Sequence, residues 1–262
     1  MSKLTTTERL KAIQRRLGVD DDGILGPDTF TRIESVIDEV LGPLEVEPRY
    51  SLIVSREGLD QIVQFEISSE SYYKKRLSHP IWPKGYSGIT IGIGYDLGYH
   101  PKTQIIRDWK GRISDTELEE IVDVAGLKGD AANAVLSTVS YIRISLVGAK
   151  EVFYTSTLPT YARLVRKAYP GVEELPADAQ AMLLSLVFNR GTKMSGNKRR
   201  EMKAIKSLVV GKDLNGIAEQ IRLMKRLWNK SELPGLHTRR DKEARMIANA
   251  RTDYHPSELI SI

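Results

Sequence analysis

The sequence predicts a mostly helical protein with a small β-sheet (mostly α, α+β class) and more than one domain. From Ser114 onward, apolar residues recur at helical spacing through nearly all of the chain. Residues 89–93 instead alternate isoleucine with threonine and glycine, which is the period of a β-strand. Residues 42–48 hold two prolines and a glycine, a composition typical of a linker between an N-terminal helical region and the rest.

The overall composition indicates a folded protein. The chain has 262 residues, of which 41% are hydrophobic and 28% charged, enough for a sizeable core. No apolar run approaches the length of a membrane span, so we expect no stable membrane insertion. Residues 1–15 lack the apolar core of a signal peptide, so we expect synthesis in a cytoplasm. The net charge of +5 favours polyanionic partners, although ordinary solubility charge explains it equally well.

Several classes of site are poorly supported. The chain has no cysteine, which excludes disulfides, thiolate nucleophiles and cysteine-ligated zinc. Its four histidines are scattered, so we expect no metal and no other cofactor. Gly92 and Gly94 lack the third glycine of a dinucleotide-binding loop, and no serine lies in a hydrolase elbow. No nucleic-acid-binding module is recognisable, so we expect no nucleic-acid partner.

Residues 1–43 are predicted to form a small helical domain, followed by a linker over residues 44–50 and a larger domain over residues 51–262. In the first domain, the apolar residues from Leu10 to Leu17 fall at helical spacing, and Gly18 is a natural helix stop. A turn follows at residues 20–23, and Pro27 can begin a second helix.

Two segments of this domain resemble the peptidoglycan-binding type 1 module. They are the LQ-type helix at residues 10–19 and the DG-containing turn at residues 22–29. The resemblance implies that the surface near the turn binds peptidoglycan, with Asp22, Gly23 and Thr29 as candidate anchor residues. For Gly23, Gly26 and Thr29, turn and capping geometry is the stronger interpretation.

Glu66 is the first candidate catalytic residue. A helix is predicted to begin after Ser55 as N-cap and to bury Leu59, Ile62 and neighbouring apolar residues, which places Glu66 near its C-terminal end. The helix dipole and apolar neighbours there would raise the pKa of the carboxyl, as a general acid requires. The alternative is an ordinary surface glutamate.

The strand at residues 89–93 carries the second group of candidates. Its isoleucines would be buried on one face, while Thr90, Gly92 and Gly94 would lie on the other. Glycine in a strand often marks close approach of a ligand or of another backbone segment. Asp96 follows the strand, and a pair of carboxyl groups such as Glu66 and Asp96 suits glycoside hydrolysis.

Further residues are candidates for substrate contacts. Trp82 and Tyr86, in a loop at residues 79–88, could present flat faces to a sugar or could simply pack the loop. Tyr95 completes the aromatic set. Asn189 and Arg190, at the end of a nearly all-apolar helix, could point into a cleft or form a C-cap.

The remainder is predicted to be helical. The expected helices are residues 115–125, 129–140, 145–153, 157–167, 176–189, 199–209, 213–228 and 238–250. Basic residues gather late in the chain, at Lys198, Arg199, Arg200, Lys203, Lys206, Arg222, Lys225, Arg226, Lys230, Arg239, Arg240, Lys242 and Arg245. They predict either a solvated face or a surface for a polyanion.

Residues 52–252 resemble the phage-type lysozymes (muramidases). The similarity lies in residues 65–66, 90–95, 188–191 and 234–244. It implies a small lobe with a β-sheet and a larger helical lobe across a cleft, with Glu66 as the acid and Thr90 as the catalytic threonine. Residues 67–89 contain no aspartate and only Glu70 as an acid. An aspartate after the strand resembles the pesticin-like branch, which implies the second carboxyl role for Asp96.

These resemblances imply an endolysin that hydrolyses the β-1,4 bond between N-acetylmuramic acid and N-acetylglucosamine. Glu66 would protonate the leaving oxygen, Asp96 would stabilise positive charge or activate water, and Thr90 would position that water. We expect a monomer whose partner is bacterial peptidoglycan, held in the host bacterial cytoplasm and acting at the cell wall, in the periplasm, after release. The alternatives are a lytic transglycosylase, an antibacterial effector or bacteriocin muramidase, and a non-catalytic wall-binding protein.

Overall fold

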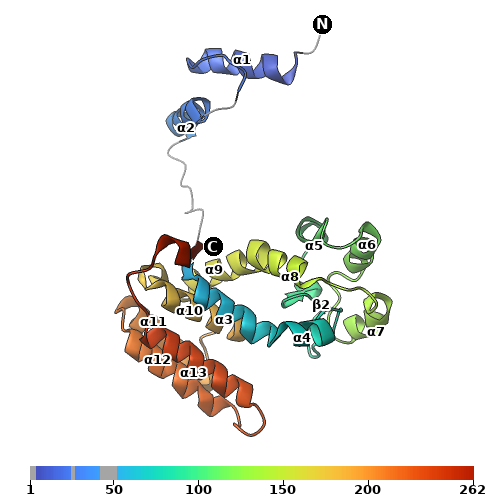
Figure 1. The fold of residues 1–262 in the computed structure, drawn as a ribbon, viewed down its shortest axis with the longest axis vertical. Coiled ribbons are helices and arrows are strands. Elements are labelled where there is room, and N and C mark those ends of the chain that lie inside the picture. Colours follow the sequence, from blue (N-terminus) through green and yellow to red (C-terminus); the bar gives the residue numbers. More distant parts are fainter. Residues whose placement is uncertain (1–3, 25–26, 42–51) are drawn as a thin grey trace. The chain divides into compact units, whose positions relative to one another are not determined.

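The computed structural model describes residues 4–24, 27–41 and 52–262 (Figure 1). About 65% of the chain is helical and the sheets are small, which confirms the prediction of a mostly α protein. The chain divides into two compact units, Met1–Arg49 and Tyr50–Ile262. The predicted linker, residues 44–50, lies outside the described residues. Within the described ranges, no helix is both long enough and apolar enough to cross a membrane.

In the described part of the first unit, the helices are α1 (Thr6–Leu17) and α2 (Pro27–Leu41). Thr5 caps α1 in a reciprocal capping box with Glu8, so the amides of Thr5 and Glu8 are satisfied. Gly18 ends the helix in the left-handed conformation, with a φ of 72°. Gly18, the predicted stop of this helix, therefore lies where the structure ends it, whereas the Thr5 cap was not predicted.

The second unit begins with a short strand and contains most of the helices. Its α-helices and strands are β1 (Ile53–Ser55), α3 (Arg56–Ile67), α4 (Glu70–Tyr72), β2 (Thr90–Ile91), β3 (Tyr95–Asp96), α5 (Lys102–Trp109), α6 (Asp115–Asp123), α7 (Asp130–Val139), α8 (Leu146–Val152), α9 (Leu158–Ala168), α10 (Ala177–Arg190), α11 (Arg200–Val210), α12 (Leu214–Leu223), α13 (Pro234–Ala248) and β4 (Leu259–Ser261). Short π-helices are η1 (Tyr73–Leu77) and η3 (Phe153–Thr157), and short 3₁₀-helices are η2 (Leu97–Tyr99), η4 (Val172–Glu174), η5 (Asn197–Arg199), η6 (Met224–Leu227) and η7 (Pro256–Glu258).

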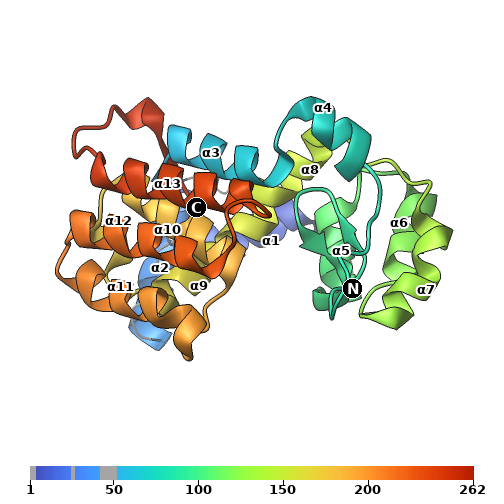
Figure 2. The ribbon, with the colours of Figure 1, turned by 90° about the horizontal axis from the view of Figure 1, so that it is seen from below.

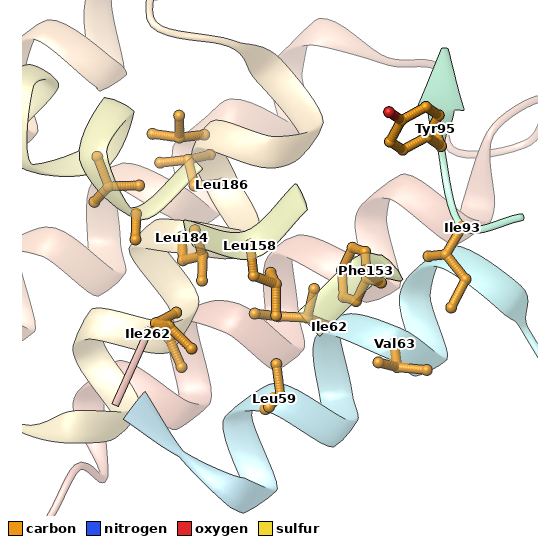
Figure 3. Packing of buried hydrophobic residues seen from close by; sticks show 14 of the residues in the cluster. Leu59, Ile62, Val63, Ile93, Tyr95, Phe153, Leu158, Leu184, Leu186 and Ile262 are labelled. Atoms are coloured by element: carbon orange, nitrogen blue, oxygen red, sulfur yellow. The ribbon is translucent and has the colours of Figure 1, made fainter. Parts of the chain in front are cut away.

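Helix α10 is the buried centre of this unit, as its apolar sequence predicts. Every residue from Ala177 to Val187 is buried. Helix α3 packs directly on it, because a Cβ atom added to Gly58 would lie 2.4 Å from the Cβ atom of Ala181. Figure 3 shows Leu59 and Ile62 of α3 within the cluster of buried apolar residues that includes Leu184 of α10. The helix that carries Glu66 is therefore fixed against the core.

The elements of the second unit gather in two groups (Figure 2). Helices α5, α6 and α7 lie with the β2–β3 hairpin, and α9 to α13 form the other group. The chain passes between the groups at α3–α4 and again at α8–η3–α9. Glu66, near the end of α3, is thus placed close to where the chain crosses.

The prediction of a single strand over residues 89–93 is wrong, because this segment forms part of a β-hairpin. Strands β2 and β3 pair antiparallel, and residues 92–94 turn between them. Gly92 and Gly94 have φ values of 57° and 67°, which are left-handed and favour glycine. Added Cβ atoms there would lie 3.0 Å from Trp109 and 3.2 Å from Phe188, respectively. Turn geometry and close packing therefore account for these glycines without a ligand.

Two other features differ from the sequence prediction. Strands β1 and β4 pair antiparallel, with Val54 opposite Ile260, although neither strand shows a recognisable period. Helix α5 was not predicted, and the segment predicted as one helix over residues 213–228 is α12 followed by the 3₁₀ turn η6. The other helices predicted after residue 114 have counterparts in the structure.

Candidate active site

Glu66 lies in the last turn of α3 and is mostly covered. Its side chain is 21% exposed, and Oε1 accepts a hydrogen bond of 2.8 Å from Nη1 of Arg239. The preceding turn buries Ile62 and Val63 against the core, and Ile67 is buried beyond it. A carboxyl that is covered on one side and reachable on the other can exchange a proton with a bound ligand.

Arg239 belongs to a buried polar cluster of α10 and α13. Its Nε donates to Oε1 of Glu243 at 3.1 Å, and its Nη2 donates to both oxygens of Ser185 at 3.0 and 3.1 Å. Ser185 Oγ and Arg240 Nη2 also donate to Oε1 of Glu243, at 2.6 and 3.0 Å. Glu243 is fully buried and pairs with both arginines. The cluster of Ser185, Arg239, Arg240 and Glu243 therefore fixes the orientation of the Arg239 guanidinium, which donates to Glu66.

Burial raises the pKa of the Glu66 carboxyl above its ordinary value. The positive charge of Arg239 and its hydrogen bond lower that pKa, whereas the charge of Glu243 raises it. The net direction is upward, as the sequence suggests, and burial is the largest cause. A raised pKa keeps more of the acid protonated near neutral pH, as a proton donor requires.

Thr90 and Asp96 lie opposite each other in the hairpin. Leu97 N donates to Ile89 O at 2.8 Å, so the neighbouring Thr90–Asp96 pair is the non-hydrogen-bonded kind, in which side chains of the two strands are closest. Both side chains are on the same face of the sheet and are partly exposed. The two residues are therefore cross-strand neighbours.

The Asp96 carboxylate is held by backbone amides. Oδ1 accepts from Gly98 N at 2.9 Å and from Gly88 N at 3.0 Å, and Oδ2 lies 3.2 Å from Gly88 N. Burial raises the pKa of Asp96, while the two amides lower it, and the net direction is upward. The charges of Glu66 and Asp96 both contribute to raising the pKa of Tyr161 on α9, so one phenol is within electrostatic reach of both carboxyls.

The predicted aromatic contacts fall into three different environments. Tyr86 is 88% exposed. Trp82 is partly buried against the core and donates from Nε1 to Ser87 O at 3.1 Å, so it also packs the loop. Tyr95 is only 1% exposed, and its hydroxyl donates to Asp108 at 2.8 Å. Tyr95 is therefore a core residue, and the prediction that it contacts sugar is wrong.

Asn189 and Arg190 end α10 and are engaged with other side chains. Asn189 is exposed and accepts from Nη2 of Arg240 at 3.2 Å. Arg190 donates from Nη2 to Lys198 O at 2.7 Å and lies over the ring of Trp228 at 5.0 Å. Burial lowers the pKa of Arg190 to about 10. Asn189 keeps an accessible amide, whereas Arg190 mainly stabilises the local packing.

The candidate anchor residues of the first unit converge on Gln14, which is fully buried. Its Nε2 donates to Asp22 Oδ1 at 2.8 Å, to Ile24 O at 2.9 Å and to Thr29 Oγ1 at 3.1 Å. Its Oε1 accepts from Gly23 N at 2.8 Å. Thr29 is 4% exposed. The motif is thus explained by turn geometry around one amide, and Asp22, which is exposed, keeps surface for a ligand.

The late basic residues do not form a single free surface. Arg239 and Arg240 are buried, with exposures of 6% and 0%. Arg226 lies 2.5 Å from the buried Glu201, and Lys225 lies 2.6 Å from Asp241. The interpretation of these four residues as a polyanion-facing surface is therefore corrected, because they pair with acids inside the fold or across helices.

Sequence reasoning missed the buried cluster, although a signal for it was present. Arg239 and Glu243 have helical i,i+4 spacing, and Arg240 and Glu243 have i,i+3 spacing. Glu70, the other acid near Glu66, is exposed in the first turn of α4. In the described residues, no group of three or more histidine, aspartate or glutamate side chains could hold a metal ion.

One comparison places the chain in a family. A family model described as Domain of unknown function (DUF8812) matches residues 62–235. The matched range includes Glu66, Thr90 and Asp96, whereas Arg239 and Glu243 follow it. No curated protein matches the chain.

Proposed function

The chain belongs to the DUF8812 family, a domain of unknown function, and from its site we propose that it is a peptidoglycan hydrolase, an endolysin-type N-acetylmuramidase. The reaction is hydrolysis of the β-1,4 bond between N-acetylmuramic acid and N-acetylglucosamine. The observation that carries the proposal is Glu66, a 21%-exposed carboxyl whose pKa is raised although an arginine lies 2.8 Å away.

In this mechanism, Glu66 donates its proton to the glycosidic oxygen as the carbon–oxygen bond breaks. Arg239 holds the Glu66 carboxyl in one orientation, and Ser185 and Glu243 hold Arg239. Asp96 stabilises the positive charge that develops on the sugar or takes a proton from the attacking water. Thr90, opposite Asp96, positions that water.

Glu66→Gln tests the proposal. Removal of a general acid lowers rates by roughly 10²- to 10⁴-fold, so the variant should lose nearly all turbidity-reducing activity on purified peptidoglycan. Glu57→Gln, the same change at an exposed position of the same helix, should leave lysis unchanged. Wild-type protein that lyses no peptidoglycan, or a Glu66→Gln variant that lyses it normally, would contradict the assignment.

A lytic transglycosylase is the second candidate, and the hydrogen bonds from two backbone amides to the Asp96 carboxylate favour it. Transglycosylases need one acidic glutamate but no second carboxylate, and the Asp96 carboxylate is occupied by the amides of Gly88 and Gly98. Mass spectrometry of the released muropeptides separates the two reactions. Hydrolysis leaves reducing ends that have gained water, whereas transglycosylation leaves anhydro-sugars that have not.

For the first unit we propose peptidoglycan binding through the surface beside the turn at residues 22–24. Support comes from the sequence motif and from the exposure of Asp22 and Ile24. An endolysin of this kind would act as a monomer, wait in the host bacterial cytoplasm and reach the wall after release. An antibacterial effector muramidase with the same chemistry would differ only in its route to the wall.

A further inference from the structure

A polar cavity is lined in part by Tyr99 and His100, which follow the β2–β3 hairpin in the chain. Its volume is about 500 Å³. One wall comes from η2 and α5, and the other from η3 and α9. The lining is almost entirely polar: Tyr99, His100, Gln104, Arg107, Asp108, Thr155, Ser156, Pro159, Thr160 and Arg163.

The carboxylate in this cavity is already contacted by its neighbours. Asp108 is 8% exposed, and its Oδ2 accepts from the Tyr95 hydroxyl at 2.8 Å and from the Ser156 hydroxyl at 2.7 Å. Nε of Arg107 lies 3.6 Å from Oδ1. Asp108 therefore braces the two walls, and its charge is largely engaged by donors of the protein.

Two arginines of different helices leave donors free at this cavity. Among the residues that the structure describes, the Arg107 guanidinium donates no hydrogen bond, and its side chain is 74% exposed. Arg163 donates one, from Nη2 to Thr160 Oγ1 at 3.2 Å. Each guanidinium carries five N–H groups in a fork that matches a carboxylate or phosphate. The cavity therefore has an excess of positive charge and of donors.

His100 adds an acceptor whose tautomer is fixed. Its Nδ1 lies 2.8 Å from the carbonyl oxygen of Asp96, and since a carbonyl can only accept, Nδ1 carries the proton. The ring is stacked on Tyr95 with centroids 4.0 Å apart. In the neutral ring, Nε2 is therefore an acceptor, and His100 lines the cavity. A ligand here meets cationic donors together with a neutral acceptor.

We propose that this cavity binds an acidic sugar, with its carboxylate held by Arg107 and Arg163 and a hydroxyl or amide group donating to His100. A simple anion would use the arginines but not the acceptor, whereas a neutral sugar would leave the arginines without a charge partner. Bound ligand would contact the ring that is hydrogen-bonded to the Asp96 backbone. The choice of N-acetylmuramic acid as the probe rests on the proposed function, but binding itself requires no hydrolysis.

The test compares N-acetylmuramic acid with N-acetylglucosamine, which lacks the 3-O-lactyl group that carries the carboxylate. Titration of the full chain, followed by the imidazole NMR signals of His100, should show saturable binding of the acid on the order of 1 mM. The neutral sugar should bind at least about tenfold more weakly, as should the acid to the Arg107→Gln/Arg163→Gln variant. Arg166→Gln is the matched control, because this arginine of α9 pairs with Glu173 at 3.3 Å and does not line the cavity.

Equal binding of the two sugars, or full binding by the double variant, would overturn the proposal. Inorganic phosphate serves as a second probe. If it binds as tightly as the acidic sugar, and through the same arginines, the cavity is an oxyanion site and the sugar part of the proposal is overturned. A chain that lyses walls but binds no acidic sugar contradicts this inference alone, whereas one that binds the sugar without lysing walls contradicts only the proposed function.

Discussion

Glu66 is a carboxyl whose negative charge is disfavoured by folding, although Arg239 donates to it. The arginine is not free to neutralise it fully, because the same guanidinium also donates to Glu243 and Ser185. Burial then outweighs the ion pair. A site of this kind keeps a reactive acid at the expense of stability, which is common where side chains serve chemistry rather than packing.

This balance predicts that Glu66→Gln stabilises the protein at neutral pH. A carboxyl whose folded-state pKa is raised destabilises the fold when ionised, and that penalty disappears as the pH falls below its unfolded pKa. Thermal unfolding should therefore occur at a higher temperature for the variant at about pH 7, with the difference shrinking towards about pH 4. Glu57→Gln should show no such stabilisation. A Glu66→Gln variant that is less stable at neutral pH would mean that the ion pair with Arg239 dominates.

Two substitutions of Asp96 separate the effect of its charge from its structural role. In Asp96→Asn, Oδ1 can still accept from Gly88 and Gly98, whereas Asp96→Ala leaves both amides without that acceptor. If Asp96 is catalytic, Asp96→Asn should lower lysis by roughly 100-fold or more at nearly unchanged melting temperature. Asp96→Ala should additionally lose about 1–3 kcal/mol of unfolding free energy. Normal lysis by the asparagine variant would leave Asp96 a structural residue only.

Single residues also show where sequence reasoning stops. The positions of Glu66 near a helix end and of Thr90 on a strand could be predicted from helix and strand patterns, and both side chains are partly exposed. Tyr95 could not be assigned, because a tyrosine in a glycine-rich segment suits a sugar face or a core equally well, and only its bond to Asp108 decides. Arg239 reads as a surface base until Glu66, distant in sequence, is placed beside it.

At the scale of elements, the β2–β3 hairpin depends on two glycines outside its turn. A Cβ atom added to Gly88 would lie 2.4 Å from Gly98 N and 2.5 Å from Asp96 Oδ1. The two ends of the hairpin thus approach too closely for any side chain at Gly88. This contact, rather than strand pairing alone, brings the Asp96 carboxylate to its amides.

Gly88→Ala should therefore disrupt the hairpin base. Overpacking of this severity costs typically 1–3 kcal/mol, so chemical denaturation should show a loss of that size, and lysis should fall as in Asp96→Ala. Gly235→Ala is the control, because nothing lies within 4 Å of its added Cβ atom. Equal stability of the two variants would show that the hairpin can relax around the methyl group.

The predictability of each element follows from how local its cause is. Helix α10 could be predicted because an apolar run of that length is buried in almost any context. The pairing of β1 with β4 could not, because three-residue strands carry too little pattern to specify a distant partner. The alternation of Ile89, Ile91 and Ile93 predicts a single strand. All three side chains are buried, as that pattern implies, but the backbone turns at residues 92–94 and forms a hairpin.

At the scale of the whole molecule, the division into two units predicts that binding and lysis are separable. A fragment of residues 50–262 contains the complete second unit and should retain lysis of purified peptidoglycan. Its co-sedimentation with peptidoglycan should weaken by about tenfold or more, because a second attached binding unit raises the effective local concentration. If the fragment binds walls as tightly as the full chain, the first unit is not the anchor.

The environment of Gln14 explains how so small a first unit fixes a loop. A side-chain amide has the same donor and acceptor atoms as a peptide group, and Gln14 uses both: it accepts from Gly23 N and donates to Ile24 O. The Gln14 side chain therefore makes the two hydrogen bonds to the turn that the backbone of a neighbouring β-strand would otherwise make. A helix residue thus satisfies the backbone of the loop, and the unit does not need the chain length of a sheet.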